Sequence, residues 1–135
     1  MTRMFVVSLL SATLFLSPTN LAAADRVQAG QWESKMTLGT GKPMLTKYCI
    51  TAADATSMNG DLATLRKYLE ESTAASTKGV CTVKNVTLTA NRTVVTLVCN
   101  KNEVTNTTTY HGDRYESTSS NGATVSGKRL GSCPK

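Results

Sequence analysis

The chain has 135 residues, with 15 lysines and arginines against 9 aspartates and glutamates, which gives a formal net charge of +6 at pH 7. This length predicts one domain with a modest core, for which covalent crosslinks would add useful stability. The basic residues are scattered, with only two adjacent pairs, Arg66-Lys67 and Lys128-Arg129, and no basic run is interleaved with aromatic side chains. We therefore expect a solvated surface and no nucleic acid partner.

The first 24 residues have the pattern of a signal peptide. Arg3 precedes an apolar stretch from Phe5 to Leu16, Pro18 ends that stretch, and Ala22-Ala23-Ala24 supplies small residues for cleavage. The apolar stretch is far shorter than the roughly 20 residues of a membrane-spanning helix, so we expect cleavage near Ala24 and no stable membrane insertion. The mature protein would be a single domain of residues 25–135 in the periplasm, or secreted.

Cysteine usage agrees with export. The chain has four cysteines, Cys49, Cys81, Cys99 and Cys133, and none forms a C-x-x-C pair. An even number of cysteines in an exported protein predicts two disulfides. Structural zinc sites use closely spaced cysteines and histidines, so we expect neither a metal nor another cofactor.

The mature chain opens with a predicted hairpin. Gly30–Leu38 alternates between two sides, with Trp32 and Met36 on the same side, as expected for a half-buried strand. A turn at residues 40–43 leads into a second strand, Met44–Ile50. The only tryptophan is a candidate binding residue, but we expect it to anchor the first strand against a helix.

The middle of the chain is predicted to be helical. Thr51 can cap a short helix, and Asp61 can cap a second one after the Asn59-Gly60 break. The small polar segment Ser72–Gly79 is expected to be a loop. The second helix has one apolar stripe, which could bind a partner, although docking onto the sheet is the simpler interpretation. The stripe consists of Leu62, Leu65, Tyr68 and Leu69.

The rest of the chain reads as five short strands with short links, which indicates an antiparallel meander. Its many threonines suit a sheet with one wet face. The fold class predicted is therefore α+β: a curved antiparallel sheet of about seven strands with one helical insertion, stapled by disulfides. The five strands are Cys81–Thr89, Arg92–Cys99, Glu103–Tyr110, Asp113–Ser119 and Gly122–Leu130.

The first hairpin of the meander predicts a register. A two-residue turn at Ala90-Asn91 opposes two pairs of strand residues, and a bulge at Lys84 or Asn85 shifts the pairs beyond it by one residue. This places two cysteines within disulfide reach of each other. The predicted pairs are Val86 with Val95, Leu88 with Thr93, Val83 with Leu97, and Cys81 with Cys99.

This register favours disulfides between Cys81 and Cys99 and between Cys49 and Cys133. The second bond would tie the last strand to the first and curl the sheet toward a partly closed barrel. Four cysteines allow three connectivities, and pairing of Cys49 with Cys81 and of Cys99 with Cys133 remains an alternative.

Several short motifs, in this order and spacing, resemble the DUF3617 family of exported bacterial proteins. The resemblance covers nearly the whole mature chain and implies a small periplasmic or secreted domain whose function is not established. It implies no catalytic residues. The motifs are Gly30-x-Trp32-Glu33, Cys49-Ile50-Thr51 before an acidic helical segment, Cys81-Thr82-Val83 with Cys99, Gly112-x-x-Tyr115, and Arg129-Leu130-Gly131-x-Cys133.

Catalytic chemistry finds little support in the sequence. The single histidine, His111, lies beside a turn glycine, where a solvated surface role is usual. The adjacent carboxylates Glu70 and Glu71 point about 100° apart on a helix, which makes them a poor acid and base pair. No nucleophile elbow, phosphate loop or dinucleotide fingerprint is present. We expect that the protein is not an enzyme.

The leading functional hypothesis is a noncatalytic periplasmic or envelope-associated binding module. It would contact an unidentified protein or a small apolar ligand through the concave face of the sheet or a tyrosine-bearing turn, whose residues are Tyr110, His111, Asp113 and Tyr115. One alternative is an inhibitor or immunity-type protein that blocks an exported enzyme. A weaker one is a small hydrolase using His111 with Asp113 or Glu116.

Overall fold

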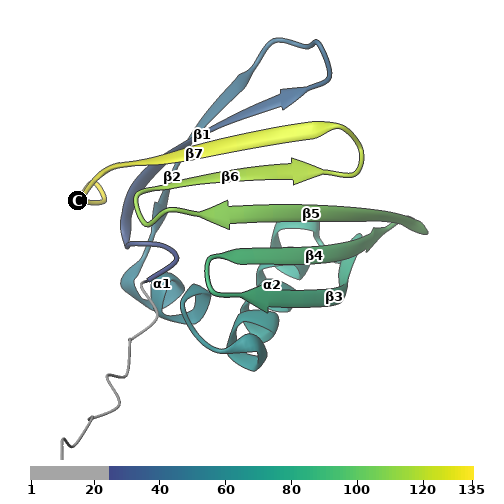
Figure 1. Ribbon diagram of the computed structural model, residues 1–135, viewed down its shortest axis with the longest axis horizontal. Coiled ribbons are helices and arrows are strands. Elements are labelled where there is room, and N and C mark those ends of the chain that lie inside the picture. Colours follow the sequence, from purple (N-terminus) through teal and green to yellow (C-terminus); the bar gives the residue numbers. More distant parts are fainter. Residues whose placement is uncertain (1–24) are drawn as a thin grey trace, which may run out of the picture.

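The structure of the chain is a computed structural model that describes residues 25–135; the predicted signal peptide lies outside the described residues. Seven antiparallel strands form one sheet, in the spatial order β2-β1-β7-β6-β5-β4-β3, and two helices connect its two edges (Figure 1). The α+β class with a helical insertion is thus confirmed. The elements are β1 Gly30–Leu38, β2 Met44–Ile50, α1 Ala52–Met58, α2 Leu62–Thr77, β3 Cys81–Thr89, β4 Arg92–Cys99, β5 Asn102–Tyr110, β6 Arg114–Ser119 and β7 Ala123–Gly131.

The sheet stays open, so the expected curl toward a barrel does not lead to closure. Strand β2 is one edge and β3 is the other. Closure would require these two strands to pair. The Cys49–Cys133 disulfide joins the end of β2 to the segment after β7, which is only two positions away in the sheet, and therefore draws neither edge toward the other.

The predicted alternation of β1 is confirmed, and it defines the two faces of the sheet. Trp32 is completely buried, and its indole nitrogen donates a hydrogen bond of 2.9 Å to the carbonyl of Gln28. It packs in a core cluster with Val27, Ile50 and the α1 residue Ala55. Trp32 therefore anchors β1 against a helix, as expected. We call its side of the sheet the inner face and the opposite side the outer face.

Both predicted helix starts are confirmed by their caps. The Thr51 hydroxyl accepts from the amide of Asp54, whose carboxylate in turn accepts from the Thr51 amide, which completes a capping box. The Asp61 carboxylate accepts from the amide of Thr64 at 2.8 Å. These side chains satisfy amides that would otherwise lack partners in the first turn of each helix.

The predicted loop at Ser72–Gly79 is wrong, because α2 continues to Thr77. The hydroxyls of Ser72 and Thr77 donate to carbonyls of the preceding turn, so these residues join the helix without competing for its backbone amides. The helix ends where Lys78 takes a left-handed conformation and its amide bonds to the carbonyl of Ala74.

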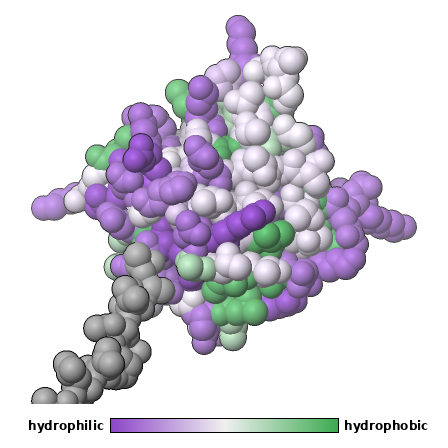
Figure 2. Space-filling model, viewed as in Figure 1, coloured by the Kyte–Doolittle hydropathy of each residue, from purple (hydrophilic) through white to green (hydrophobic). Residues whose placement is uncertain are grey.

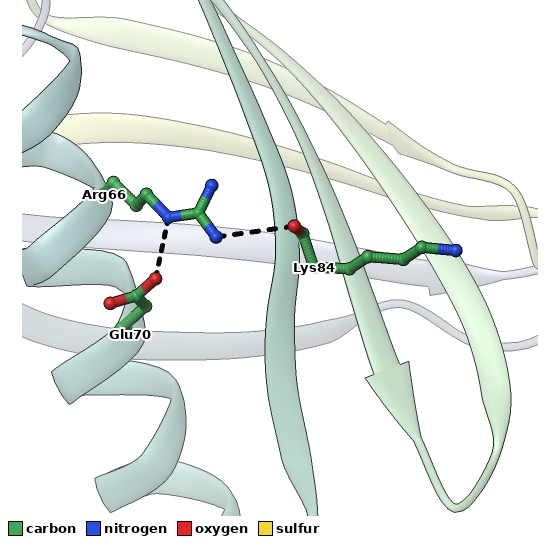
Figure 3. A network of polar contacts seen from close by, with 3 residues as sticks. All are labelled: Arg66, Glu70 and Lys84. Carbon is green, nitrogen blue, oxygen red and sulfur yellow. Dashed lines mark hydrogen bonds and ion pairs between the residues drawn. The ribbon is translucent and has the colours of Figure 1, made fainter.

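One side of α2 docks onto the sheet, but the apolar stripe is not uniformly covered. Leu65 is only 2% exposed, whereas Leu62 is 46% exposed. A polar network holds the same part of the helix to β3: the Arg66 guanidinium donates to Glu70 and to the carbonyl of Lys84 (Figure 3). Docking is therefore the main role of the stripe. No helix within residues 25–135 is long and apolar enough to cross a membrane.

The register predicted for the β3–β4 hairpin is confirmed, including the irregularity between Val83 and Asn85. The bulge leaves Lys84 without a partner on β4, and its carbonyl is available to Arg66 on the helix. The observed pairs include Val83 with Leu97, Val86 with Val95, Leu88 with Thr93, and Cys81 with Cys99.

The disulfides link Cys81 with Cys99 and Cys49 with Cys133, which is the pairing that the sequence analysis favours. The first bond staples neighbouring strands across 18 residues of chain, and the second closes a loop of 84 residues. Because the entropy of an unfolded loop grows with its length, the second bond constrains the unfolded chain more strongly.

Removing the long-range disulfide should therefore destabilise the protein more than removing the local one. We expect the Cys49→Ser/Cys133→Ser variant to lose about 4.5 kcal/mol and the Cys81→Ser/Cys99→Ser variant about 3 kcal/mol of unfolding free energy. Urea denaturation of the mature protein measures both. A larger loss in the Cys81 and Cys99 variant would contradict this ranking, and nonreducing peptide mapping checks the pairing itself.

The cap of α2 predicts a pH dependence. Hydrogen bonds from the Thr64 amide lower the pKa of Asp61 below its usual value. The folded state thus favours the ionised form of Asp61. The ionised cap stabilises the fold fully above the unfolded pKa of about 4, and this stabilisation is lost as pH falls through the lower folded pKa. The stability gap between wild type and Asp61→Ala should narrow over that window in urea titrations. A gap that is constant with pH would contradict this origin.

A tyrosine-lined cleft on the inner face

The candidate site is a cleft between α2 and the inner face of the sheet. Antiparallel register brings Met36, Val125, Ser117 and Thr108 of four successive strands side by side on that face. Leu65 and Leu69 of α2 line the same space from the helical side, and its volume is about 430 Å³. The other lining residues are Leu38, Met58, Thr73, Thr93, Val95, Leu97, Val104, Asn106, Tyr110, Ser119, Asn121 and Ala123.

Among residues 25–135, no charged residue lines this cleft. Its walls are aliphatic side chains interrupted by hydroxyls and two amides, so the cleft offers apolar contact with a few hydrogen-bonding groups. The buried hydroxyl of Ser119 has no hydrogen-bond partner among the described residues. An unsatisfied buried hydroxyl is costly, and a ligand with a polar atom could satisfy it.

A second cavity of about 300 Å³ continues the cleft toward α1. The two cavities share a border, and all four tyrosines of the chain line the second one. Within the described part of the chain, Asp54 is its only charged lining residue. We call this end of the cleft the tyrosine pocket. The shared border is made of Met58, Thr108, Tyr110, Ser117 and Val125.

The tyrosines hold one another in place. The hydroxyls of Tyr48 and Tyr115 are 2.9 Å apart and hydrogen-bonded. Tyr115 also lies in tilted contact with Tyr110, at 6.3 Å between ring centroids, and with Trp32, at 5.8 Å. Tilted aromatic pairs at such distances add to the stability gained by burial. Tyr68 comes from α2 and completes the pocket from the helical side.

Burial keeps these phenols protonated. It raises the pKa of Tyr48 far above the usual value, and the hydrogen bond to Tyr115 raises it further. Burial also raises the pKa of Tyr110 and of Tyr68, and the charge of Asp54 adds to the effect on Tyr68. At neutral pH Tyr48, Tyr68 and Tyr110 therefore present uncharged rings and hydroxyls, and none of the three is suited to act as a general base.

A glycine makes room for Tyr115. Gly127 pairs with Tyr115 across β6 and β7, and a Cβ atom at Gly127 would lie 2.0 Å from a ring carbon of Tyr115. The ring therefore lies flat over the glycine, an arrangement known to stabilise glycines within sheets. A side chain at residue 127 would displace the ring that connects Trp32 to the tyrosine pocket.

The binding surface predicted at the tyrosine-bearing turn divides between the two faces. Tyr110 and Tyr115 are opposed, as expected of a cross-strand pair, and both line the inner pocket. His111 and Asp113 are exposed, and His111 lines a separate groove on the outer face, which Tyr115 also borders. The four residues thus form no single surface. Of these four, the inner cleft retains only the tyrosines.

The outer groove has a volume of about 570 Å³ and a mixed set of charges. Glu33 and Lys128 form an ion pair across its floor at 3.4 Å. His111 and Glu116 both line it, but Asp113 does not and pairs with Arg114 at 3.5 Å. The residues of the hydrolase alternative are therefore only partly brought together. Most of the surface in Figure 2 is likewise pale or purple, and green apolar side chains form small patches.

Sequence reasoning missed Tyr48 and Tyr68 as site residues. Tyr48 opposes Trp32 in the β1–β2 hairpin, so the alternation of β2 already placed it on the inner face. Tyr68 belongs to the apolar stripe of α2. The sequence pattern thus indicated the buried side for each tyrosine, but only the fold shows that the two side chains line the same pocket. Within residues 25–135, no group of three or more His, Cys, Asp or Glu side chains could hold a metal ion.

The contact between residue 127 and Tyr115 yields a prediction. Gly127→Ala should destabilise the fold by about 1 to 3 kcal/mol because the added methyl overpacks the ring. It should also change the near-ultraviolet circular dichroism of the tyrosines. Ser126→Ala, on the outer face of the same strand, is the control and should change neither. Unchanged stability of Gly127→Ala would show that the ring does not rest there.

The comparisons with known proteins give one match. A family model described as "Protein of unknown function (DUF3617)" matches residues 27–133. The matched range includes every strand and helix described above and all four cysteines. No curated protein and no solved structure matches the chain.

Proposed function

The chain belongs to the DUF3617 family, whose function is not established, and from the site itself we propose that it is an exported, noncatalytic binding module that holds a small apolar molecule in the inner cleft. The observation that carries this proposal is the absence of any charged residue from the lining of the 430 Å³ cleft. A surface that served only as the interior of the fold would leave less space between helix and sheet.

The dimensions suit a small ligand. The cleft and the tyrosine pocket have volumes of about 430 and 300 Å³. Ligand sites in proteins typically measure roughly 300 to 1,000 Å³ and combine apolar walls with a few polar groups. Each Å² of apolar ligand surface removed from water contributes about 25 cal/mol, so a chain of several methylenes could bind through this contact alone.

Export is the second part of the proposal. It rests on the signal pattern of residues 1–24 and on two disulfides, which form and persist in oxidising compartments. The periplasm or the exterior of a bacterial cell would be such a compartment. A binding module there could store, carry or sense an apolar molecule that water dissolves poorly.

A noncatalytic role agrees with the chemistry of the cleft. Tyr48, Tyr68 and Tyr110 have raised pKa values and remain protonated near neutral pH. The only histidine lies on the outer face, away from the cleft lining. The alternative role as an inhibitor of an exported enzyme would use exposed loops and would not require an empty apolar cleft.

Two neighbouring valines on β4 provide a matched test. Val95 lines the cleft and Val94 lies on the outer face, yet both are half-buried. Val95→Lys should weaken binding of the neutral fluorescent probe N-phenyl-1-naphthylamine at least tenfold, because it brings a charge into an apolar site. Val94→Lys should leave the affinity within about twofold. Probe fluorescence measured against protein concentration gives both values.

Thermal unfolding of both variants controls for loss of structure. Equal weakening by the two substitutions would show that the probe binds elsewhere or that binding follows stability. If the wild-type protein does not bind the probe or any alkyl amphiphile, the binding proposal fails. Capture of an exported enzyme through the outer face would then favour the inhibitor alternative.

A further inference from the structure

The tyrosine pocket and the apolar cleft adjoin each other and have chemically different linings. The shared residues Met58 and Val125 lie between them. The cleft end has no charged lining residue and suits an alkyl chain. The pocket end has four phenol rings and one carboxylate, and therefore suits a head group of different chemistry. Such a pair of linings suits an amphiphile.

The charge at the pocket end excludes an anionic head group. Asp54 is the only charged residue in the lining. Its Oδ2 atom accepts from the Thr51 hydroxyl at 2.7 Å and from the Thr51 amide at 3.2 Å, whereas Oδ1 bonds to no other described residue. A carboxylate repels carboxylates, sulfates and phosphates, and it attracts cations. The overall positive charge of the protein does not alter this local preference.

The tyrosine rings add to the attraction for a cation. The face of an aromatic ring carries partial negative charge, and clusters of rings bind quaternary ammonium groups without hydrogen bonds. Raised pKa values keep the phenols of Tyr48, Tyr68 and Tyr110 neutral, so these rings are intact partners for a cation at neutral pH.

One cation lies close to the tyrosines. Arg26 is 8% exposed. The charge of its guanidinium lowers the pKa of Tyr110, against the larger raising effect of burial. However, it donates to the carbonyls of Met58 and Gly60, at 3.0 and 2.5 Å, and it does not line the pocket. Its charge is thus directed at the end of α1, where the helix dipole is negative, and Asp54 is the charged residue among those that line the pocket.

We propose that the tyrosine pocket receives the cationic head of an amphiphile, a quaternary or protonated amine, while its alkyl chain lies in the adjoining cleft. This inference rests on the proposed function, because it names the ligand class for the same site. The rings of Tyr48, Tyr68, Tyr110 and Tyr115 surround the head, and the free oxygen of Asp54 supplies the countercharge.

Three probes with the same alkyl chain test the head group: decyltrimethylammonium, decyl sulfate and the neutral tetraethylene glycol monodecyl ether. Calorimetry with the disulfide-bonded mature protein, below the micelle concentration of each probe, gives the affinities. The ammonium probe should bind at least tenfold more tightly than the neutral one, and the sulfate should bind most weakly.

Variants of two residues assign the preference. Asp54→Asn should lower the affinity for the ammonium probe about tenfold and leave the affinity for the neutral probe within twofold. Asp113→Asn, which lies outside the cleft and the pocket, is the matched control and should leave both affinities unchanged. Tyr68→Leu should lower the affinity for the ammonium probe several-fold, whereas Tyr68→Phe, which keeps the ring, should not lower it. Circular dichroism and thermal unfolding show whether each variant is folded.

The outcomes separate this inference from the proposed function. If all three probes bind equally, or if the sulfate binds best, the cationic head is refuted while the apolar cleft stands. If none of the probes binds, both proposals fail. An ammonium preference that survives Asp54→Asn and Tyr68→Leu would also refute the inference, because the preference would arise elsewhere.

Discussion

The burial of one tryptophan determines how the rest of the molecule is arranged. Trp32 lies in the core cluster between β1 and α1, and it contacts Tyr115 in the middle of the sheet. A one-residue slip of β1 would turn this side chain to the wet outer face, so its burial selects the register of the strand. Every inner-face residue of the neighbouring strands, including those that line the cleft, follows from that register.

Local rules predicted much of the fold. Alternation identified both faces of β1, caps identified the starts of α1 and α2, and a turn with one bulge placed Cys81 opposite Cys99. These features depend on residues close in sequence, or on a short hairpin. The end of α2 was missed because small polar residues are weak helix formers, and their hydroxyls can join the helix by bonding to the preceding turn.

The site could be predicted only in fragments. Tyr110 and Tyr115 face each other across a hairpin and were found, but Tyr48 and Tyr68 reach the pocket from the far edge strand and from α2. Their meeting depends on the path of the helices between the two sheet edges. The lone histidine was predicted to share a binding surface with the tyrosines of the turn, yet it lines the groove on the outer face, opposite the cleft. Chemistry and topology must be combined to find such a site.

The position of the Cys49–Cys133 bond has a consequence for damage by proteases. The bond encloses α1, α2 and most of the sheet within one covalent ring. Any single cut between these two cysteines, including one at the α1–α2 junction, opens the ring but leaves the two fragments joined. A nicked molecule would keep its strands together and could retain its architecture.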